Sequence, residues 1–426
     1  MSDVDRFVAI VIGAGPAGSA CAYTLARAGR SVLMIERGAA AGAKNVTGGR
    51  LYTYALELVE EGLYVRAPLE RQVVREQIML LGDSGGATVD YCYYGFKAGV
   101  PQSYTILRAV FDEWFAVQAE AQGALLAAGI RVDDVIERDG CIVGVRAGED
   151  EMFADVVVAA DGVNSLIGQK AGLFGDITAH NVGVGVKEVI ALAPDLIEAR
   201  FNLAADEGAA RVILGATDGI PGGGFLYTNR DSVSLGLVFN PARAAAHGRK
   251  LHEIMQDFKL HPAIHPLIAG GTTVEYSAHL VPEAGWRAVP KKLYRDGLMV
   301  VGDAAGFVIN TGTSIRGIDL AMVSGVAAAK AILSATGSAV GPAYMAKLEE
   351  HKLAAHMKLF ASWPDIMENP RLFTAYPRLA NDALKFMFTV DGRVPEKLPR
   401  AMLAIARRHV GLGRMAADFW RGFWSL

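Results

Sequence analysis

Three glycines near the start of the chain have the spacing that brings a phosphate group close to the backbone. Gly13, Gly15 and Gly18 form the pattern G-x-G-x-x-G between an apolar run at 8–12 and an alanine-rich helical pattern at 19–28. The first glycine permits a tight turn, the second lets the backbone approach a pyrophosphate, and the third lets the helix pack closely on the strand. The pattern predicts a dinucleotide site, whose phosphates meet the positive end of the helix.

An acidic residue strengthens this prediction. Glu36 follows a second apolar run at 31–35 and lies 18 residues after Gly18. A carboxylate at that place can accept hydrogen bonds from the hydroxyl groups of an adenosine ribose. The alternative is a glycine-rich turn of an ordinary α/β protein, which the strand–turn–helix context and the acid make the weaker interpretation.

The composition limits the classes of function. Of the 426 residues, 52% are hydrophobic and 20% are charged, and the mean hydropathy is +0.25. A chain of this length is expected to form two or three packed subdomains. Its apolar composition favours a surface that meets a membrane, a partner or a lipid-like ligand. The net charge of −3 gives no reason to propose nucleic-acid binding.

Cysteine usage and the N-terminal sequence indicate the compartment. Cys21, Cys92 and Cys141 lie far apart, and we interpret all three as small buried hydrophobic residues. They are too few to hold an iron–sulfur cluster, which normally needs four thiolates, so no metal site is predicted. The first residues do not have the pattern of a signal peptide, and no uncharged apolar run reaches the roughly 18 residues of a membrane span. We therefore expect a cytoplasmic protein that is peripheral on the inner face of the cell membrane.

Two segments in the first third of the chain are candidates for ligand contact. The glycine-rich, polar stretch at 39–50 suits a loop wrapped over a ligand, with an ordinary surface loop as the alternative. Arg108 stands just before a helix predicted at 110–128, and it is either a solvated charge or a clamp for a phosphate. Two strands joined at Asp139-Gly140 are predicted over 130–145.

Two more buried strands lead into polar residues. The apolar run at 156–160 ends in Asp161-Gly162, and the run at 297–301 leads into Gly302-Asp303. A helix is predicted at about 314–333, and its face carries small residues at every fourth position, namely Gly317, Ala321, Gly325 and Ala329. A bare face of this kind allows close contact with a sheet or a neighbouring core.

A second domain with an antiparallel sheet is predicted from residues 182–275. Strands alternate there with glycine-rich turns, and a helix is predicted at 251–260. The clearest hairpin covers 222–239. An earlier pair of strands, 77–81 and 87–94, is also joined by a glycine-rich turn.

The last residues combine basic charge with aromatic side chains. Residues 391–426 hold seven Lys or Arg against three Asp or Glu. Read as a helix, the end of the chain places Phe419 and Trp420 on one broad face, with Arg414 and Asp418 opposite. This is the composition of an interfacial membrane anchor, and the alternative is a C-terminal helix docked on its own core or on a partner.

The order and spacing of the glycine motif with Glu36, Arg108, Asp161-Gly162 and Gly302-Asp303 resemble the glutathione-reductase-type FAD flavoproteins of the aromatic-hydroxylase branch. Within that branch the chain is similar to the FixC family, the bacterial relatives of electron-transfer-flavoprotein:quinone oxidoreductase. Further segments carry this likeness: 42–52, 223–229, 275–279, 281–285 and 315–321. The likeness weakens in the tail.

The resemblance implies a fold and a division of the chain. The expected fold class is α/β, with a glutathione-reductase-type Rossmann FAD domain, an antiparallel-sheet substrate domain and a helical C-terminal region. The expected boundaries are 1–75, 105–175 and 276–340 for the discontinuous FAD domain, 76–104 and 176–275 for the substrate or quinone domain, and 341–426 for the helical region.

The resemblance also implies roles for individual residues. The ADP half of FAD would lie on the glycine motif and Glu36, with Arg108 at the phosphates and Asp161-Gly162 beside the adenosine and pyrophosphate. Val132, in the strand after the long helix, would meet the adenine, and Asp303 would bind the ribitol. The 312–314 turn would lie near the N1–O2 edge of the flavin, and the 44–49 loop would cover the ring. The full expected set is Gly13, Gly15, Pro16, Ala17, Gly18, Glu36, Arg37, Lys44, Asn45, Val46, Thr47, Gly48, Arg108, Val132, Ala160, Asp161, Gly162, Gly302, Asp303, Gly312, Thr313 and Ser314.

The implied function is the transfer of electrons from a two-subunit electron-transfer flavoprotein to a membrane quinone. No catalytic side chain is assigned, because the flavin does the redox chemistry. Phe225 and Tyr227 either line a quinone channel or are core aromatics, and His279 is either a structural histidine or a proton donor to quinol. The quinone oxidoreductase carries a C-terminal [4Fe–4S] domain, whereas this chain has no cysteine after Cys141. A small ferredoxin-like [4Fe–4S] subunit is therefore an expected partner in a Fix-type complex, and the basic tail is a candidate docking face for it.

Two other functions share the same motifs. One is an NAD(P)H-dependent flavin monooxygenase or isoprenoid reductase. The other is an assembly subunit in which FAD is mainly structural.

Overall fold

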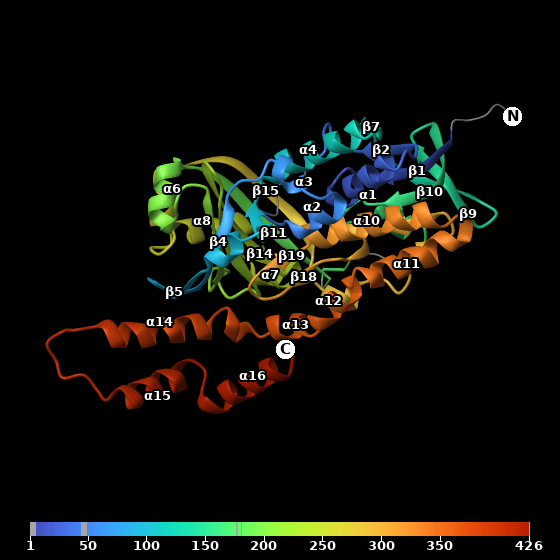
Figure 1. The fold of residues 1–426 in the computed structure, drawn as a ribbon. Helices are drawn as coiled ribbons and strands as arrows, with labels where there is room; N and C mark the ends of the chain where they lie inside the picture. Colours follow the sequence, from blue (N-terminus) through green and yellow to red (C-terminus); the bar gives the residue numbers. More distant parts are fainter. Residues whose placement is uncertain (1–5, 44–48, 176–177, 180, 426) are drawn as a thin grey trace.

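The computed structural model describes the chain except residues 1–5, 44–48, 176–177, 180 and 426, and the side chains of residues 423–425. Two sheets form the body, and helices cover them (Figure 1). The α-helices are α1 (Pro16–Arg27), α2 (Tyr54–Val59), α3 (Leu63–Arg66), α4 (Arg108–Ala121), α5 (Leu166–Lys170), α6 (Pro194–Phe201), α7 (Pro241–His247), α8 (Leu251–Leu260), α9 (His265–Ile268), α10 (Ile318–Ser334), α11 (Val340–Glu350), α12 (Leu353–Leu359), α13 (Trp363–Met367), α14 (Ala375–Phe388), α15 (Leu398–His409) and α16 (Leu412–Ser425). Short 3₁₀ turns are η1 (Tyr94–Lys97), η2 (Gly285–Ala288), η3 (Gly302–Ala305), η4 (Gly337–Ala339) and η5 (Pro370–Leu372).

The first sheet is mostly parallel. In spatial order its strands are β16 (Tyr294–Arg295), β17 (Leu298–Val300), β10 (Asp150–Ala159), β1 (Arg6–Ile12), β2 (Val32–Glu36) and β7 (Leu125–Ala128), and β9 (Cys141–Ala147) and β8 (Asp134–Arg138) extend it from β10. The apolar runs predicted as buried strands form its centre, because strands covered on both faces need continuous hydrophobic sequence. Since β1, β10 and β17 are parallel neighbours, the segments that follow Ile12, Ala159 and Val300 meet at one edge of this sheet.

The second sheet is mixed. Its strands, in spatial order, are β15 (Thr272–Pro282), β11 (Val182–Ala191), β14 (Ser232–Phe239), β13 (Gly222–Thr228), β12 (Glu207–Leu214), β4 (Gln72–Leu81), β6 (Ser103–Thr105) and β3 (Arg50–Tyr52), with β5 (Gly86–Cys92) paired to β4. Both predicted hairpins are present, as β4–β5 and β13–β14. The antiparallel prediction is wrong for β4 and β12, which run parallel, because a long crossover rather than a hairpin separates them in the chain.

This sheet also crosses two of the predicted domain boundaries. It takes in β3, which lies before residue 75, and all of β15, which extends past residue 275. The division of the chain into three parts stays a prediction.

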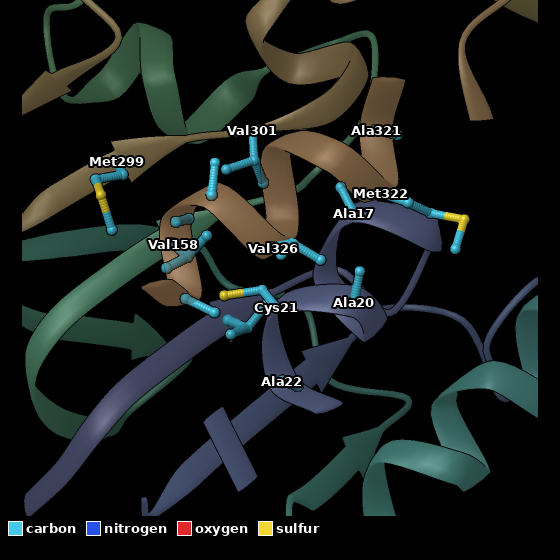
Figure 2. Close-up of a cluster of buried hydrophobic side chains, with 14 of the residues drawn as sticks. Ala17, Ala20, Cys21, Ala22, Val158, Met299, Val301, Ala321, Met322 and Val326 are labelled. Atoms are coloured by element: carbon cyan, nitrogen blue, oxygen red, sulfur yellow. The ribbon is translucent and has the colours of Figure 1, made fainter. Parts of the chain in front are cut away.

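The bare face of the helix predicted at 314–333 packs on α1. A Cβ atom at Gly325 would lie 2.1 Å from the carbonyl oxygen of Ala17, so a side chain at this position would push the two helices apart. Figure 2 shows Ala321 and Val326 of α10 beside the small side chains of α1. The stripe therefore allows close contact between α10 and the helix that begins at the glycine motif.

Two predicted helix boundaries need correction. The helix α4 ends at Ala121, not at 128, because Gly123 has a φ of +107° and the next residues pair with β2 as the edge strand β7. Val132 consequently lies in the irregular connection between β7 and β8, rather than in a strand. The helix α10 begins at Ile318 rather than near 314, because the preceding residues form a small hairpin of β18 (Ile309–Asn310) and β19 (Ile315–Arg316).

The three cysteines do not share one environment. Cys21 is fully buried between α1 and its neighbours (Figure 2), as predicted. Cys92 ends β5 and Cys141 begins β9 directly after a turn, and both are only half-buried. The interpretation as buried hydrophobic residues is therefore wrong for these two.

The C-terminal arm, residues 375–425, lies beside the second sheet as an outer layer (Figure 1). Its α14 contacts β4 and β5, and its α16 contacts α13. The predicted C-terminal helix is present as α16, with Asp418 facing Arg371 and Tyr376, whereas Phe419 and Trp420 are exposed. The polar side of α16 thus docks on its own chain. Within the described residues, no helix combines the length and the apolar character needed to cross a bilayer.

We expect the Asp418→Asn substitution to release α16. Arg371 donates two hydrogen bonds to this carboxylate, at 2.7 and 2.5 Å, and the Tyr376 hydroxyl donates a third at 2.8 Å. These bonds, above all those from Arg371, lower the pKa of Asp418 from 3.8 to about 2. Because the folded-state pKa is the lower one, the stabilisation is complete above about pH 4 and is lost as the pH falls towards 2. The loss is expected to be about 2 kcal/mol.

Hydrogen exchange of the α16 amides against pH measures this effect. The wild-type amides should lose protection between about pH 4 and 2, and the Asn variant should lack that protection at neutral pH. Asp391→Asn is the control, because the Asp391–Arg393 pair is exposed and its atoms are 3.8 Å apart. Equal protection in the Asp418 variant and in wild type would show that the ion pair does not hold the helix.

Candidate functional site

A cavity of about 560 Å³ lies between the carboxyl ends of the first sheet and one face of the second. Its wall includes the glycine motif and the segments that follow β10 and β17, and it continues along β13 and β15. Residues of α13, from the C-terminal region, complete the wall. One continuous space therefore joins the predicted dinucleotide site to the second sheet.

The glycine motif forms the predicted turn between β1 and α1. Gly13 has a φ of +100°, and a Cβ atom there would lie 2.3 Å from the carbonyl oxygen of Ala160. A Cβ atom at Gly18 would lie 1.9 Å from the carbonyl oxygen of Gly13. Because Gly15 has no side chain to cap the helix, and Pro16 needs no hydrogen-bond partner, the first turn of α1 can offer its N–H groups to an anion.

Glu36 is held in place by backbone groups next to this turn. Its carboxylate accepts hydrogen bonds from the N–H of Ala14 at 3.0 Å and the N–H of Gly38 at 2.7 Å. Glu36, Arg37 and Val132 all line the cavity. A carboxylate oxygen can accept more than one hydrogen bond, so Glu36 can also accept bonds from sugar hydroxyls.

Asp161 presents an acceptor without a partner. Its Oδ2 accepts a hydrogen bond from the N–H of Ile167 at 3.0 Å, whereas Oδ1 is buried and meets no donor among the described residues. Burial raises the pKa of this carboxyl. Because buried polar atoms are nearly always paired, the free oxygen marks a position for a donor on a bound molecule. Ala160 and Gly162 flank it on the cavity wall.

Arg108 and Asp303 bring opposite charges to the same wall. Arg108 opens α4, and its guanidinium donates two hydrogen bonds to the buried Asp112, at 2.8 and 2.7 Å. Burial raises the pKa of Asp303, and the charge of Arg108 partly opposes that rise. The ion pair orients Arg108 towards the cavity, and its contact with a phosphate stays a proposal.

The turn between β18 and β19 contacts other parts of the chain on two sides. It brings Gly312, Thr313 and Ser314 to the cavity wall. Gly312 has a φ of +75°, and a Cβ atom there would lie 1.9 Å from the indole ring of Trp363. On the other side, the Ser314 Oγ forms a hydrogen bond of 3.3 Å with the hydroxyl of Tyr52. The turn is therefore fixed by the second sheet and by the C-terminal region together.

Two aromatic rings cover glycines on the face of the second sheet. A Cβ atom at Gly236 would lie 2.3 Å from the ring of Phe225, and one at Gly49 would lie 2.7 Å from the ring of Tyr227. The two rings are 5.4 Å apart between centroids, and both line the cavity. Burial, with the charges of two arginines, lowers the pKa of His279 on the same wall. This part of the wall is suited to a planar ring.

Most of the predicted residues come together in this cavity. Those on its wall are Gly13, Gly15, Pro16, Ala17, Glu36, Arg37, Arg108, Val132, Ala160, Asp161, Gly162, Asp303, Gly312, Thr313 and Ser314. Gly18 and Gly302 do not line it, and they instead allow close packing against Gly13 and Ala17. The predicted contacts of Lys44, Asn45, Val46, Thr47 and Gly48 lie outside the described residues. The glycine turn and the free acceptor of Asp161 fit a cofactor with phosphates and sugar hydroxyls, and the aromatic wall fits a flat ring in the same cavity.

Similarity to known proteins extends over the whole chain. It is 46% identical to the probable electron transfer flavoprotein-quinone oxidoreductase YdiS of Escherichia coli, over 100% of both chains, and 46% identical to Protein FixC of Salmonella typhi, over 98% of each. The chain belongs to the ETF-QO/FixC family. Residues 363–426 match the ETF-QO/FixC family C-terminal domain, and residues 9–82 match the FAD dependent oxidoreductase family. This member of the ETF-QO/FixC family is an FAD-dependent oxidoreductase, so the predicted family and cofactor are confirmed.

Solved structures share the fold at lower identity. A geranylgeranyl bacteriochlorophyll reductase-like protein from Thermoplasma acidophilum matches with a TM-score of 0.70 and 21% identity, over 95% of this chain and 96% of its own. PqsL, a probable FAD-dependent monooxygenase from Pseudomonas aeruginosa, matches with a TM-score of 0.63 and 17% identity, over 87% of this chain and 98% of its own. At these identities the likeness shows the fold alone.

Sequence reasoning missed the part of the cavity wall that follows β15 and the part formed by α13. Glu283 and Arg287 lie on the wall, and Arg287 donates two hydrogen bonds of 2.6 Å to Asp365 of α13. Residues 281–285 are part of the likeness to the ETF-QO/FixC family, but the sequence predicts no role in the site for them. The charged Glu283, placed directly after a strand end, is the signal that could have identified this part of the site.

Proposed function

We propose that the chain passes electrons from an electron-transfer flavoprotein to a quinone, with FAD bound between donor and acceptor. The observation that carries this proposal is the continuous cavity, which joins the glycine turn to the wall of Phe225 and Tyr227. A flat, apolar quinone ring suits that wall, and it would share one space with the cofactor. The name of the relative YdiS, which is 46% identical, gives the same donor and acceptor.

We propose a glutathione-reductase-type arrangement of the cofactor. The glycine turn and Glu36 would hold the ADP half, Arg108 the phosphates and Asp303 the ribitol. The free oxygen of Asp161 supports a hydrogen bond from the cofactor near the end of β10. Bound FAD supplies the electron chemistry, while the chain orients it and keeps water from the ring.

A separate ferredoxin-like subunit is the proposed source of an iron–sulfur cluster. Cys21, Cys92 and Cys141 stand on different elements, α1, β5 and β9, and three thiolates fall short of the usual four. The exposed face of the C-terminal arm, with its basic residues, is the proposed docking surface for this partner.

We also propose that the arm touches the inner face of the cell membrane. At the turn between α14 and α15, Phe388, Val390 and Val394 are 79%, 95% and 96% exposed. Phe419 and Trp420 of α16 are exposed as well, and seven basic residues lie within 391–426. Apolar and basic side chains on one outer layer favour a peripheral membrane contact.

A reduction assay with each candidate donor tests the function. Reduced electron-transfer flavoprotein should bleach the flavin absorbance of the purified holoprotein. Addition of a short-chain quinone should restore that absorbance. NADPH alone, under anaerobic conditions, should leave the flavin absorbance unchanged. Rapid bleaching by NADPH would favour a monooxygenase or isoprenoid reductase instead. Failure of the reduced flavoprotein to bleach the FAD would favour a structural cofactor.

A further inference from the structure

Tyr52 of β3 reaches the turn between β18 and β19 from the second sheet. Its hydroxyl oxygen and the Oγ of Ser314 are 3.3 Å apart, which is within hydrogen-bond distance. Among the described residues, each of these two hydroxyl groups is the only hydrogen-bond partner of the other. Ser314 lines the large cavity, whereas Tyr52 is not part of its described wall. The hydrogen bond therefore joins a residue of the cavity wall to a residue behind it.

Contacts connect this pair to the aromatic part of the wall. The ring of Tyr227 covers Gly49, and the next residue, Arg50, lines the cavity as well. The Cζ of Arg50 lies 4.8 Å from the centre of the Tyr52 ring. Because the hydroxyl group of that ring meets Ser314, these contacts bring Ser314 to the part of the cavity that suits a planar ring.

Two arginines fix the ring of Tyr52. The Cζ of Arg316, in β19, lies 5.1 Å from the ring centre, so two guanidinium groups lie over the same ring. Each guanidinium group is held by a carboxylate, that of Arg50 by Glu76 and that of Arg316 by Asp319, with hydrogen bonds of 3.0 Å. Cations are attracted to the negative face of an aromatic ring. The carboxylates thus hold the arginines, and the arginines hold the ring.

The same charges decide the direction of the hydrogen bond. Two positive charges beside the ring repel the hydrogen of the Tyr52 hydroxyl group, and Ser314 Oγ is the acceptor that the described residues offer to it. Tyr52 is therefore the donor and Ser314 the acceptor. A serine hydroxyl group has one hydrogen to donate as well as two positions that accept. Ser314 consequently keeps its own hydrogen for another acceptor.

We propose that Ser314 donates this hydrogen to a carbonyl oxygen of a planar ring in the cavity, and that Tyr52 is the positioning residue that orients the donor. Both FAD and a quinone carry such an oxygen, and reduction of either ring makes it more negative. Because hydrogen bonds to a negative acceptor are stronger, the pair favours the reduced form of the ring that it meets. A bond to FAD depends only on the cofactor of the family, whereas a bond to a quinone rests on the proposed function.

Tyr52→Phe tests the proposal, because it removes the hydroxyl group and keeps the ring. The reduction potential of the bound FAD is measured by slow anaerobic reduction beside an indicator dye, which needs neither the donor flavoprotein nor a quinone. If the acceptor is FAD, the preference for the reduced over the oxidised cofactor should fall about tenfold, which lowers the potential by about 30 mV. If the acceptor is a quinone, the potential should stay unchanged and the KM for a short-chain quinone should rise about tenfold.

A double-mutant cycle tests whether Tyr52 acts through Ser314. Ser314→Ala should change the same quantity at least as much as Tyr52→Phe, and the double variant should change it no further than Ser314→Ala alone. Ser314→Thr keeps a hydroxyl group and should restore most of the wild-type value. Tyr54→Phe is the matched control, because the Tyr54 hydroxyl group donates to Asp319 of the same charged cluster, at 2.8 Å, and forms no hydrogen bond with Ser314. It should behave as wild type.

Three results would overturn the proposal. One is a wild-type potential together with a wild-type KM in Tyr52→Phe and in Ser314→Ala. Another is a double variant whose changes add, because the two residues would then act independently. The third is an equal change in Tyr54→Phe, which would trace the effect to the charged cluster instead of the hydroxyl pair. If no quinone reoxidises the reduced wild-type protein, the proposed function fails, and the potential still tests the bond to FAD.

Discussion

A Gly18→Val variant is expected to fold and to be colourless. A Cβ atom at this position would lie 1.9 Å from the carbonyl oxygen of Gly13 and 3.1 Å from a methyl group of Val11. Both neighbours belong to β1 and the glycine turn, the proposed phosphate site, so α1 must move away from β1. Overpacking of this kind costs up to about 3 kcal/mol. If this cost destabilises the FAD-bound protein and not the apoprotein, the affinity for FAD drops about a hundredfold.

The ratio of flavin to protein absorbance after purification measures this loss, and a titration of the apoprotein with FAD gives the affinity. Gly413→Ala is the matched control, because nothing lies within 4 Å of a Cβ atom there. Its flavin content should equal that of wild type. A yellow Gly18→Val protein with full FAD content would show that the turn does not set the affinity.

The largest expected loss of stability comes from Glu76→Gln. Arg50 is almost fully buried, with 6% of its side chain exposed, and its guanidinium forms two hydrogen bonds with the Glu76 carboxylate, one of them 3.0 Å. Two further hydrogen bonds, at 3.1 and 3.0 Å, go to the hydroxyl of Ser103. Removing the carboxylate leaves a buried positive charge without its counterion, which is expected to cost about 3 kcal/mol.

The midpoint of urea unfolding measures this cost. Glu151→Gln is the control, because the Glu151–Arg146 pair is 40% and 48% exposed, and such pairs contribute at most about 1 kcal/mol. The Glu76 variant should also bind FAD less tightly, since Arg50 lines the cavity. If both variants unfold at the wild-type midpoint, the buried pair does not stabilise the fold.

Local patterns were enough to predict the central strands of the first sheet and the two hairpins. The apolar runs in β1, β2 and β10 are continuous because both faces are covered, and the turn residues at 82–85 and 229–231 define β4–β5 and β13–β14. The parallel pairing of β4 with β12 could not be predicted, because nothing in either strand encodes which distant strand becomes its neighbour. The edge strand β7 was missed because its residues, two leucines and two alanines, have high helix propensity.

Residues of the candidate site could be predicted where a local sequence motif determines the backbone conformation by itself. The glycine turn needs only neighbours in sequence, so Gly13, Gly15 and Glu36 were found at once. The wall formed by α13 depends on the long-range contact between Trp363 and Gly312, which are 51 positions apart. Glu283 was missed for the same reason, since the space that Gly183 leaves for its side chain appears only when β11 and β15 pair.

The contact between Trp363 and Gly312 has a consequence for biosynthesis. The wall of the cofactor cavity is incomplete until α13 is made, 51 positions after the turn that Trp363 supports. Until then the 310–314 turn lacks one of its two supports, and the cavity lacks the part of its wall that α13 forms. Synthesis of α13 and completion of the cavity wall are thereby coupled in time.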